Sequence, residues 1–551
     1  MTRVFTGLSR FFTPVFLTVA FMLSDTVQLC GQATDTAAGV WMADGGDGTY
    51  RNPILYADYS DPDVVRVGAD FFMVSSSFNC VPGIPVLHSK DMVNWQIINH
   101  VFKKQIPDSV FSIVQHGNGA WAPSIRHHKG EFYVYYGDPD FGIYMSKTSD
   151  PLGSWSEPHL LRPAKGWIDP CPLWDDDGNA YLVHAFAGSR SGRKSILVAH
   201  RMTQDGKTLL DDGVMVFDGH ASHPTIEGPK FYKRNGFYYI FAPGGGVQYG
   251  WQTVLRSSQI YGPYEDRVVL HEGKTGINGP HQGAWIELEN GTSWFYHFQD
   301  CNAYGRILHL QPMEWKKDWP VIGSDPDGDG IGEPVKVHRK PNTGYSGPLL
   351  QMQTSDEFNS PLPGLQWQWQ ANPEPEWMFL AGNEGFMRLY CQYNGSADPN
   401  FWEIPHLYLQ KFPAPEFTAT AKVRFQPMQD GDRMGLIIMG MSYSAISIEQ
   451  SEGQIFYTVI RNPEADQGGE NLRDPPVPIQ SKELYMRVQV MKNAKCAFSI
   501  STDGKNFTGT GDTFEAVAGK WIGAKVGLFA VGSLWTNDTG WADVDWFRIT
   551  K

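Results

Sequence analysis

The chain has 551 residues, with 45 Lys and Arg against 59 Asp and Glu, which gives a net charge of −14. At about 100 to 200 residues per domain, this length predicts two sizeable domains. The negative charge excludes nucleic acid and anionic membrane surfaces as the main partners, because both need a positive field. The 58 Gly, 37 Pro and abundant aromatic residues, with 19% charged residues, predict many strands and tight turns.

Residues 1–33 have the pattern of a secretory signal peptide. Two arginines precede an apolar run from Phe11 to Leu23, and small residues follow up to Ala33. The apolar run is too short to span a bilayer, and no later segment reaches the length of a membrane helix. The sequence therefore predicts a secreted or periplasmic protein.

Five segments between residues 45 and 340 share one plan: a polar or turn-forming start, an apolar strand, a Gly or Asp turn, an aromatic strand and a third strand. They open at Asp61, Ala122, Asp169, Glu227 and Gln282. They recur at about 50 to 60 residues, and each holds a hairpin turn flanked by alternating apolar residues. Units of this length predict a five-bladed β-propeller over residues 45–340.

Three of the five openers are acidic: Asp61, Asp169 and Glu227. In a propeller the first strand of each blade lines the central channel, so these side chains converge on one end of the axis. An acidic residue beside proline is ordinary turn chemistry when it occurs once, but three in register favour a site. Like charges at short range raise one another's pKa, so such a cluster is unfavourable unless the site uses it.

Two kinds of chemistry use three carboxylates around one channel. One is a metal site; the other is acid–base catalysis, in which a protonated carboxyl and an ionised one work together. Glycoside hydrolysis needs such a pair, because an acid protonates the leaving oxygen while a carboxylate activates water or attacks the sugar. The aromatic residues near the openers that offer stacking faces for a sugar are Phe78, Trp121, Phe141 and Trp251.

The motifs of this region resemble glycoside hydrolase family 43. They are YSDPDV from Tyr59, WAP from Trp121, WIDPCPLWDDDG from Trp167, TIEGPKFYK from Thr225 and GPHQGAW from Gly279. The resemblance covers nearly all of residues 50–340 and implies a propeller hydrolase that inverts configuration and acts on arabinose- or xylose-containing polysaccharides. It matches Asp61 with the general base, Glu227 with the general acid, and Asp169 with the carboxylate that tunes and positions the acid.

The resemblance also implies roles for two further residues. His281 falls where many relatives help to hold a calcium ion and its waters, and a hydrogen-bonded channel histidine without a metal is the alternative. Arg306 resembles the family arginine that reaches the sugar and the carboxylates, and an ion pair between blades is the alternative. Residues 325–330 read like the start of a calcium loop, but Lys336 stands where a bidentate Glu is needed, so turn chemistry explains them better.

The turn-rich segment 340–348 predicts the end of the propeller. Residues 348–551 hold alternating strands without acid-led repeats, which predicts an antiparallel, concanavalin-like β-sandwich. It resembles the lectin-like sandwich often fused to this hydrolase family. We expect it to wall one side of the pocket, which favours exo action; sugar binding through its tryptophans is the alternative, at Trp367, Trp369, Trp377 and Trp402.

The sequence thus predicts an all-β, exo-acting, inverting hydrolase that removes terminal α-L-arabinofuranosyl or β-D-xylosyl units from plant cell-wall oligosaccharides. It does not choose between the two sugars, because they present hydroxyls in similar places. Inversion predicts carboxyl groups about 6.5 to 9.5 Å apart, which leaves room for the attacking water. The alternative is a non-catalytic sugar-binding surface protein, and the presence of all three carboxylates speaks against it.

Overall fold

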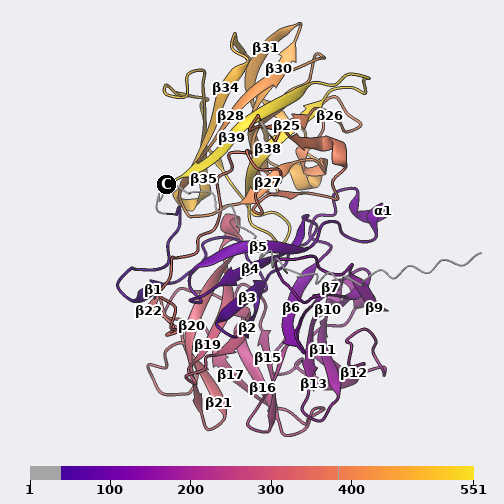
Figure 1. The fold of residues 1–551 in the computed structure, drawn as a ribbon, viewed down its shortest axis with the longest axis vertical. Helices are drawn as coiled ribbons and strands as arrows, with labels where there is room; N and C mark the ends of the chain where they lie inside the picture. The colour runs from indigo at the N-terminus through magenta and orange to yellow at the C-terminus, as the bar shows by residue number, and fades with distance from the viewer. Residues whose placement is uncertain (1–38, 383) are drawn as a thin grey trace, which may run out of the picture. The chain divides into compact units, whose positions relative to one another are not determined.

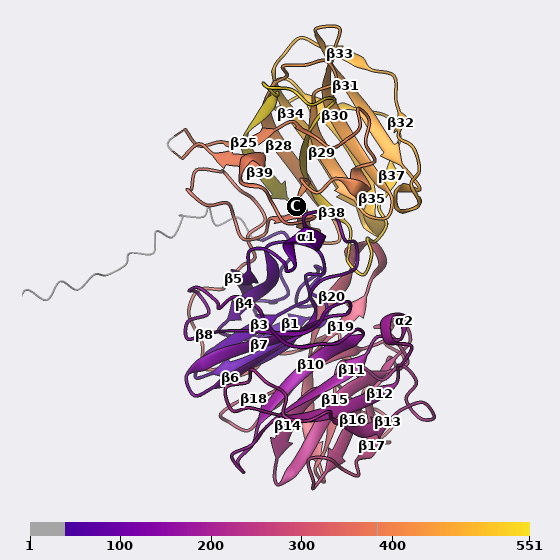
Figure 2. The ribbon, with the colours of Figure 1, turned by 90° about the vertical axis from the view of Figure 1, so that its right-hand side faces the viewer.

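The computed structural model describes residues 39–382 and 384–551, so the predicted signal peptide lies outside the described residues. In this part of the chain strands dominate, and the two α-helices, α1 (Asp108–Phe111) and α2 (Gly188–Ser191), have four residues each. None of the described helices has the length and hydropathy to cross a membrane. Figures 1 and 2 show two groups of sheets, one in indigo to pink and one in orange to yellow.

The first group is a five-bladed propeller, as predicted. Five four-stranded antiparallel sheets each use four consecutive strands. The strands are β2 (Asp63–Val67), β3 (Asp70–Val74), β4 (Gly83–Ser89), β5 (Trp95–Phe102); β6 (Trp121–His128), β7 (Glu131–Asp138), β8 (Gly142–Thr148), β9 (His159–Pro163); β10 (Trp167–Trp174), β11 (Ala180–Phe186), β12 (Ile196–Met202), β13 (Val214–Asp218); β14 (Lys230–Arg234), β15 (Phe237–Gly244), β16 (Trp251–Ser257), β17 (Glu265–Leu270); β18 (His281–Glu287), β19 (Ser293–Asp300), β20 (Arg306–Lys316) and β21 (Trp319–Ile322).

Local turn chemistry builds the blades. Lys129-Gly130 and Asn235-Gly236 have positive φ at both positions, and they join β6 to β7 and β14 to β15. Two such residues form the mirror-image turn whose twist matches a hairpin. The middle strands are buried almost throughout, as in Phe132–Asp138 of β7, because both of their faces pack against neighbouring blades.

The ring is closed by residues from its two ends. The short strand β1 (Thr49–Arg51) pairs antiparallel with β22 (Val337–Arg339). The side-chain amide of Asn52 donates to the carbonyls of Leu310 at 2.7 Å and Val335 at 2.8 Å. β18, the first strand of the fifth blade, contacts β2, the first strand of the first blade. The fifth blade is therefore fastened to the segment that precedes the first.

Each blade opens with a left-handed backbone residue. The φ angles are 55° at Asp61, 36° at Ala122, 57° at Asp169, 60° at Gly228 and 34° at Gln282. Four of these five are not glycine, and non-glycine residues rarely adopt this conformation unless the surrounding structure enforces it. The register of β6, β10 and β18 also shifts beside it. The chain thus kinks at the point where each blade begins.

The second group of sheets is the predicted β-sandwich. One sheet contains β23 (Gln368–Trp369), β26 (Gln392–Tyr393), β27 (Tyr408–Lys411), β29 (Arg433–Met439), β30 (Tyr443–Ser451), β31 (Gln454–Asn462), β32 (Leu472–Arg473), β33 (Val477–Ile479) and β38 (Lys525–Gly532). The other contains β24 (Met378–Leu380), β25 (Met387–Tyr390), β28 (Phe417–Gln426), β34 (Glu483–Met491), β35 (Lys495–Ser501), β36 (Thr508–Gly509), β37 (Phe514–Glu515) and β39 (Trp541–Thr550). Long strands such as β28 and β34 alternate buried and more exposed residues, which is the pattern of a sheet with one face in the core.

The tryptophans considered as a sugar platform belong to the core of the protein. Their exposed fractions are 2% for Trp367, 7% for Trp369, 8% for Trp377 and 7% for Trp402. Trp369 also forms a backbone bridge to Val81 of the propeller. Buried rings of this kind cannot stack on a polysaccharide, so these four residues have a structural role.

Candidate active site

Three blades bring their acidic openers to one site. Asp61 stands two residues before β2, Asp169 lies inside β10, and Glu227 stands three residues before β14. Each lies at or beside the left-handed kink that opens its blade. Arg306 contacts Asp61, and the charge of Asp61 acts on Asp169. The charge of Asp169 in turn acts on Glu227, so the three carboxyls belong to one site.

Asp61 is held by a cation and a hydroxyl. Nη1 of Arg306 lies 3.3 Å and 3.4 Å from its two carboxyl oxygens. Oγ of Ser76 donates to Oδ2 of Asp61 at 2.5 Å and accepts from the backbone N–H of Ala122 at 2.7 Å. Because the hydroxyl proton points to Asp61 while the neighbouring blade orients the oxygen, the carboxyl is fixed in one direction.

Asp169 is the most enclosed of the three carboxyls. Its Oδ2 accepts from the backbone N–H of Gly228 at 2.7 Å, which ties it to the residue after Glu227. Burial, followed by the charge of Asp61, raises the pKa of Asp169 to about 7, against the opposing effects of that N–H group and of nearby cations. Asp169 is therefore placed to act on Glu227 through both charge and backbone position.

Glu227 has the environment of a general acid. Its side chain is 24% exposed, and its Oε1 lies 3.5 Å from Nε2 of His281. Burial, then the charges of Asp169 and Asp61, raises the pKa of Glu227 to about 8, and Arg306 opposes them. The carboxyl is therefore mostly protonated at neutral pH, as a proton donor must be.

Arg306 occupies the first position of β20, and aromatic rings surround its guanidinium. The distances from its Cζ to the ring centroids are 4.9 Å for Phe298, 5.8 Å for Trp521 and 6.0 Å for Phe78. Aromatic faces attract a cation and limit its motion. Arg306 contacts Asp61, and because this is also an ion pair between the fifth and first blades, its contact with a sugar stays a prediction.

Of the four predicted stacking residues, Phe78 and Trp121 contact each other, whereas Phe141 and Trp251 contact other residues. Phe78 and Trp121 lie edge to face with centroids 6.1 Å apart, and Phe78 is only 2% exposed, so it supports Arg306 and Trp121 from behind. Phe141 packs instead against Phe111, and Trp251 donates from Nε1 to Nδ1 of His223.

A loop of the sandwich reaches this site. Trp521 lies edge to face with Trp121 at 6.4 Å and is 46% exposed. A cavity of about 220 Å³ is lined by residues 518–522 and Met441 from the sandwich and by Asp300, Asn302, Gly305 and Arg306 from the propeller. The two domains therefore share one cavity, with Arg306 in its wall.

His281 is buried, and its imidazole ring is neutral. Neither of its ring nitrogens has a hydrogen-bond partner among the described residues, and burial lowers its pKa to about 3. Calcium takes six to eight oxygen ligands, but the group of three potential ligands found in the described part of the chain is Asp325, Asp327 and Asp329. No cluster of three potential ligands is found around His281 in the described part of the chain, and its metal role stays a prediction.

Four residues that touch the site lay outside the sequence predictions. Ser76 lies in a run of serines, and Trp521 belongs to the sandwich, which has no acid-led repeats. Neither residue therefore stood out in the sequence as a site residue. Gln282, whose Nε2 lies 3.5 Å from Oδ2 of Asp169, was identified as the opener of the fifth unit but was not assigned to the site. Asp58 accepts from the backbone N–H groups of Arg306 at 2.9 Å and Gly523 at 3.0 Å, and it precedes the first repeat.

Comparisons with known proteins identify the family of each domain. The profile of glycosyl hydrolases family 43 matches residues 50–320, and the profile of the beta xylosidase C-terminal concanavalin A-like domain matches residues 355–550. A putative beta-xylosidase of Xylanibacter ruminicola is 41% identical over 88% of this chain and 86% of its own. A non-reducing end alpha-L-arabinofuranosidase of Bacteroides ovatus is 28% identical over 92% and 96%. The crystal structure of BlXynB from Bacillus licheniformis is 25% identical and covers 91% of this chain and 99% of its own, with a TM-score of 0.77.

Proposed function

The chain belongs to glycosyl hydrolases family 43 and is a glycosidase, and on that premise we propose that it is an exo-acting, inverting enzyme that releases terminal β-D-xylosyl units from xylose-containing oligosaccharides. The observation that carries the proposal is the pairing of a protonated Glu227 with an Asp61 carboxylate held by Arg306. The 41% identical relative named as a putative beta-xylosidase supports the choice of sugar.

In the proposed reaction Glu227 donates its proton to the glycosidic oxygen as the bond between that oxygen and the anomeric carbon breaks. Asp61 removes a proton from a water molecule, whose oxygen bonds to the opposite face of the same carbon. The products are the shortened oligosaccharide and a free sugar of inverted configuration. Solvent then returns a proton to Glu227 and removes one from Asp61.

Asp169 and Arg306 assist without exchanging protons with the substrate. The charge of Asp169 helps to keep Glu227 protonated, and its bond to the N–H of Gly228 fixes the adjoining backbone. Arg306 holds Asp61 in position to face a water molecule. Trp521 of the sandwich lies beside Trp121 and Arg306, which supports exo action, because a wall at this point turns an open groove into a pocket for one chain end.

Release of terminal α-L-arabinofuranosyl units is the second candidate. The Bacteroides ovatus relative, 28% identical over 96% of its own length, is named for that activity. A secreted or periplasmic location is also part of the proposal, supported by the apolar run from Phe11 to Leu23.

The replacement Glu227→Gln tests the assignment of the acid. We expect hydrolysis of xylobiose to fall about 10²- to 10⁴-fold, the usual contribution of a general acid. Aryl xylosides with good leaving groups should lose much less, because their departure needs little protonation. Glu265→Gln, an exposed acid of the same blade, is the matched control and should retain activity.

NMR observation of the first-formed anomer tests inversion directly. An α-xylose product from a β-xyloside supports the proposal, and a β-xylose product overturns the mechanism while leaving the glycosidase assignment intact. Full activity of Glu227→Gln on xylobiose would overturn the acid assignment.

A further inference from the structure

Three consecutive serines follow β3, and the contacts of their hydroxyl groups differ. Oγ of Ser75 donates to the backbone carbonyl of Ser60 at 2.9 Å, whereas Oγ of Ser76 donates to the carboxyl of Asp61. Oγ of Ser77 has no hydrogen-bond partner among the described residues. All three serines are buried. Ser76 is therefore the member of this run whose hydroxyl acts on a carboxyl of the catalytic site.

The hydroxyl proton of Ser76 points to one oxygen of Asp61. Oγ of Ser76 accepts from the backbone N–H of Ala122 at 2.7 Å, so this N–H occupies one of its lone pairs. The hydroxyl then donates to Oδ2 of Asp61 at 2.5 Å, as in a short bond to a charged acceptor. A proton bound to Oδ2 would displace the hydroxyl proton from this acceptor. A proton that the carboxyl takes up therefore belongs on Oδ1.

The contact with Arg306 does not distinguish the two carboxyl oxygens of Asp61. Nη1 of Arg306 lies 3.3 Å from Oδ1 and 3.4 Å from Oδ2, so it is nearly equidistant from them. The guanidinium attracts the carboxylate as a whole, and both distances are longer than those of a strong charge-assisted hydrogen bond. In the described structure, the bond from Ser76 is thus the contact that makes the two oxygens unequal.

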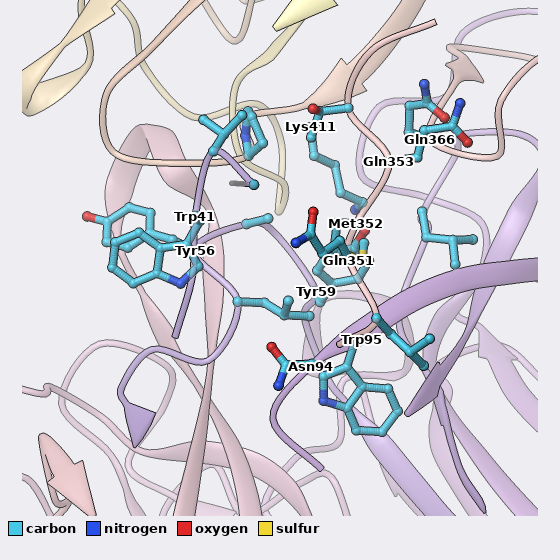
Figure 3. A pocket seen from close by; sticks show the side chains of 18 of the residues that line it. Trp41, Tyr56, Tyr59, Asn94, Trp95, Gln351, Met352, Gln353, Gln366 and Lys411 are labelled. Atoms are coloured by element: carbon cyan, nitrogen blue, oxygen red, sulfur yellow. The ribbon is translucent and has the colours of Figure 1, made fainter. Parts of the chain in front are cut away.

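The backbone that carries Asp61 is held by other contacts. Nζ of Lys411 donates to the backbone carbonyl of Asp58 at 2.5 Å and lies 5.1 Å from the centroid of the Tyr59 ring. Both Lys411 and Tyr59 line a cavity of about 80 Å³ between the N-terminal segment, the first blade and the linker to the sandwich (Figure 3). With the backbone anchored there, the side-chain torsions of Asp61 still have to be set, and Ser76 provides a contact that sets them.

We propose that Ser76 is a positioning residue for the base, which holds Oδ2 of Asp61 so that Oδ1 receives the proton of the attacking water. This inference rests on the proposed inverting hydrolysis. In that step an O–H bond of water breaks as its oxygen bonds to the anomeric carbon, and the proton passes to Oδ1. The electron pair of the glycosidic bond leaves with the oxygen that Glu227 protonates. The hydroxyl proton of Ser76 stays on Oγ throughout.

The variant Ser76→Ala removes the hydroxyl. We expect kcat for xylobiose to fall about 10- to 100-fold, the usual contribution of one hydrogen bond to a charged group. KM should change less than about twofold, because the buried serine orients the base and does not bind the substrate. Aryl xylosides with good leaving groups should lose a similar factor, since water must be activated whichever group departs. Glu227→Gln largely spares those substrates, so the two variants separate the base from the acid.

The neighbouring serines provide matched controls. Ser77→Ala removes a buried hydroxyl without a partner, and Ser75→Ala removes one that bonds only to backbone carbonyls, so both should keep most of the parent kcat. Ser76→Thr keeps the hydroxyl and should recover most of the kcat that Ser76→Ala loses. Urea melts compare the folding of all variants. Should Ser76→Ala fold poorly, Ser76→Cys has the weaker S–H donor and should give an intermediate kcat.

Three outcomes would overturn the inference while the proposed function stands. One is a kcat of Ser76→Ala equal to that of Ser77→Ala. Another is a loss confined to xylobiose, which would mean that Ser76 acts on the acid. The third is an equal loss of kcat in Ser75→Ala, which would mean that the serines act only through the fold. A β-xylose product from the parent enzyme is a different result, because it would remove the base role of Asp61 and this inference with it.

Discussion

Two carboxyl groups in one pocket differ because their contacts differ. Asp61 faces the Arg306 guanidinium and the Ser76 hydroxyl, whereas the nearest polar contact of Glu227 is the neutral ring of His281. Burial and the charge of Asp169 then raise the pKa of Glu227 to about 8. A proton donor and a proton acceptor can therefore coexist at one pH.

The alkaline limb of the pH profile should report Glu227. The acid works only when protonated, so kcat/KM for xylobiose should fall as the pH rises through about 8. An aryl xyloside with a good leaving group should show a shallower limb. Rates measured from pH 5 to 10 check this, and an alkaline limb near pH 5 would contradict the acid's pKa.

The same shift affects stability. The folded pKa of Glu227, about 8, is above its ordinary value of 4.5, so the folded state binds the extra proton between these values. The free energy of unfolding should fall as pH rises through this window, by at most about 1.4 kcal/mol per pH unit. The variant Glu227→Gln has no such proton to lose. In urea melts its free energy of unfolding, compared with that of the parent, should therefore rise between pH 5 and pH 8. A constant difference across that range would count against the shift.

At the scale of elements, the catalytic pocket depends on how a blade start and a sandwich loop are joined. Asp58 accepts from the backbone N–H of Arg306 with one carboxyl oxygen and from that of Gly523, two residues after Trp521, with the other. Gly305 packs so closely that an added Cβ would lie 2.6 Å from the carboxyl carbon. One carboxylate thus sets the position of both Arg306 and the Trp521 loop.

The replacement Asp58→Asn should loosen that joint. An amide cannot accept at both ends, so one N–H is left unpaired, at a cost of about 1 to 3 kcal/mol in the free energy of unfolding. KM for xylobiose should rise several-fold more than kcat falls, and the alkaline limb should stay near pH 8. Steady-state kinetics and urea melts test this against Asp512→Asn, an exposed control. An unchanged KM would remove Asp58 from the positioning of the pocket.

The blades and their acidic openers could be predicted because repetition carries them. Each unit repeats one hairpin and one kink, with Asp61 and Asp169 at the kink of their blades and Glu227 one residue before the kink at Gly228, so the repeat alone places all three at blade starts. Asp58 and Trp521 could not be predicted, since no repeat relates them and their 463-residue separation (521 minus 58) leaves no local signal. The structural role of the sandwich tryptophans could not be predicted either, because burial against another domain does not change their spacing in the sequence.

At the scale of the molecule, propeller and sandwich share a core. One hydrophobic cluster contains Val81 of the first blade, Ala303 of the fifth and Trp369 of the sandwich. Nζ of Lys525 donates to Sγ of Cys80 at 2.9 Å and to Oε1 of Gln368 at 3.0 Å, where all three side chains are buried. Separating the domains would expose both the apolar cluster and this polar group.

The two domains should therefore unfold together. Calorimetry of the full chain should give one transition, with calorimetric and van't Hoff enthalpies that agree. Residues 39–340 alone should aggregate or lose several degrees of Tm, because the exposed cluster is large and apolar. Two resolved transitions in the full chain would mean that the shared core contributes little.

The pairing of β1 with β22 also orders events during synthesis. In β1, Tyr50 must wait for its partner His338, 288 residues later (338 minus 50). At about 5 to 20 residues per second, a ribosome needs about 15 to 60 s to supply it. His281, Arg306 and the Trp521 loop are synthesised after residue 280, so a nascent chain carries Asp61, the proposed base, for most of its synthesis before the rest of the proposed site exists.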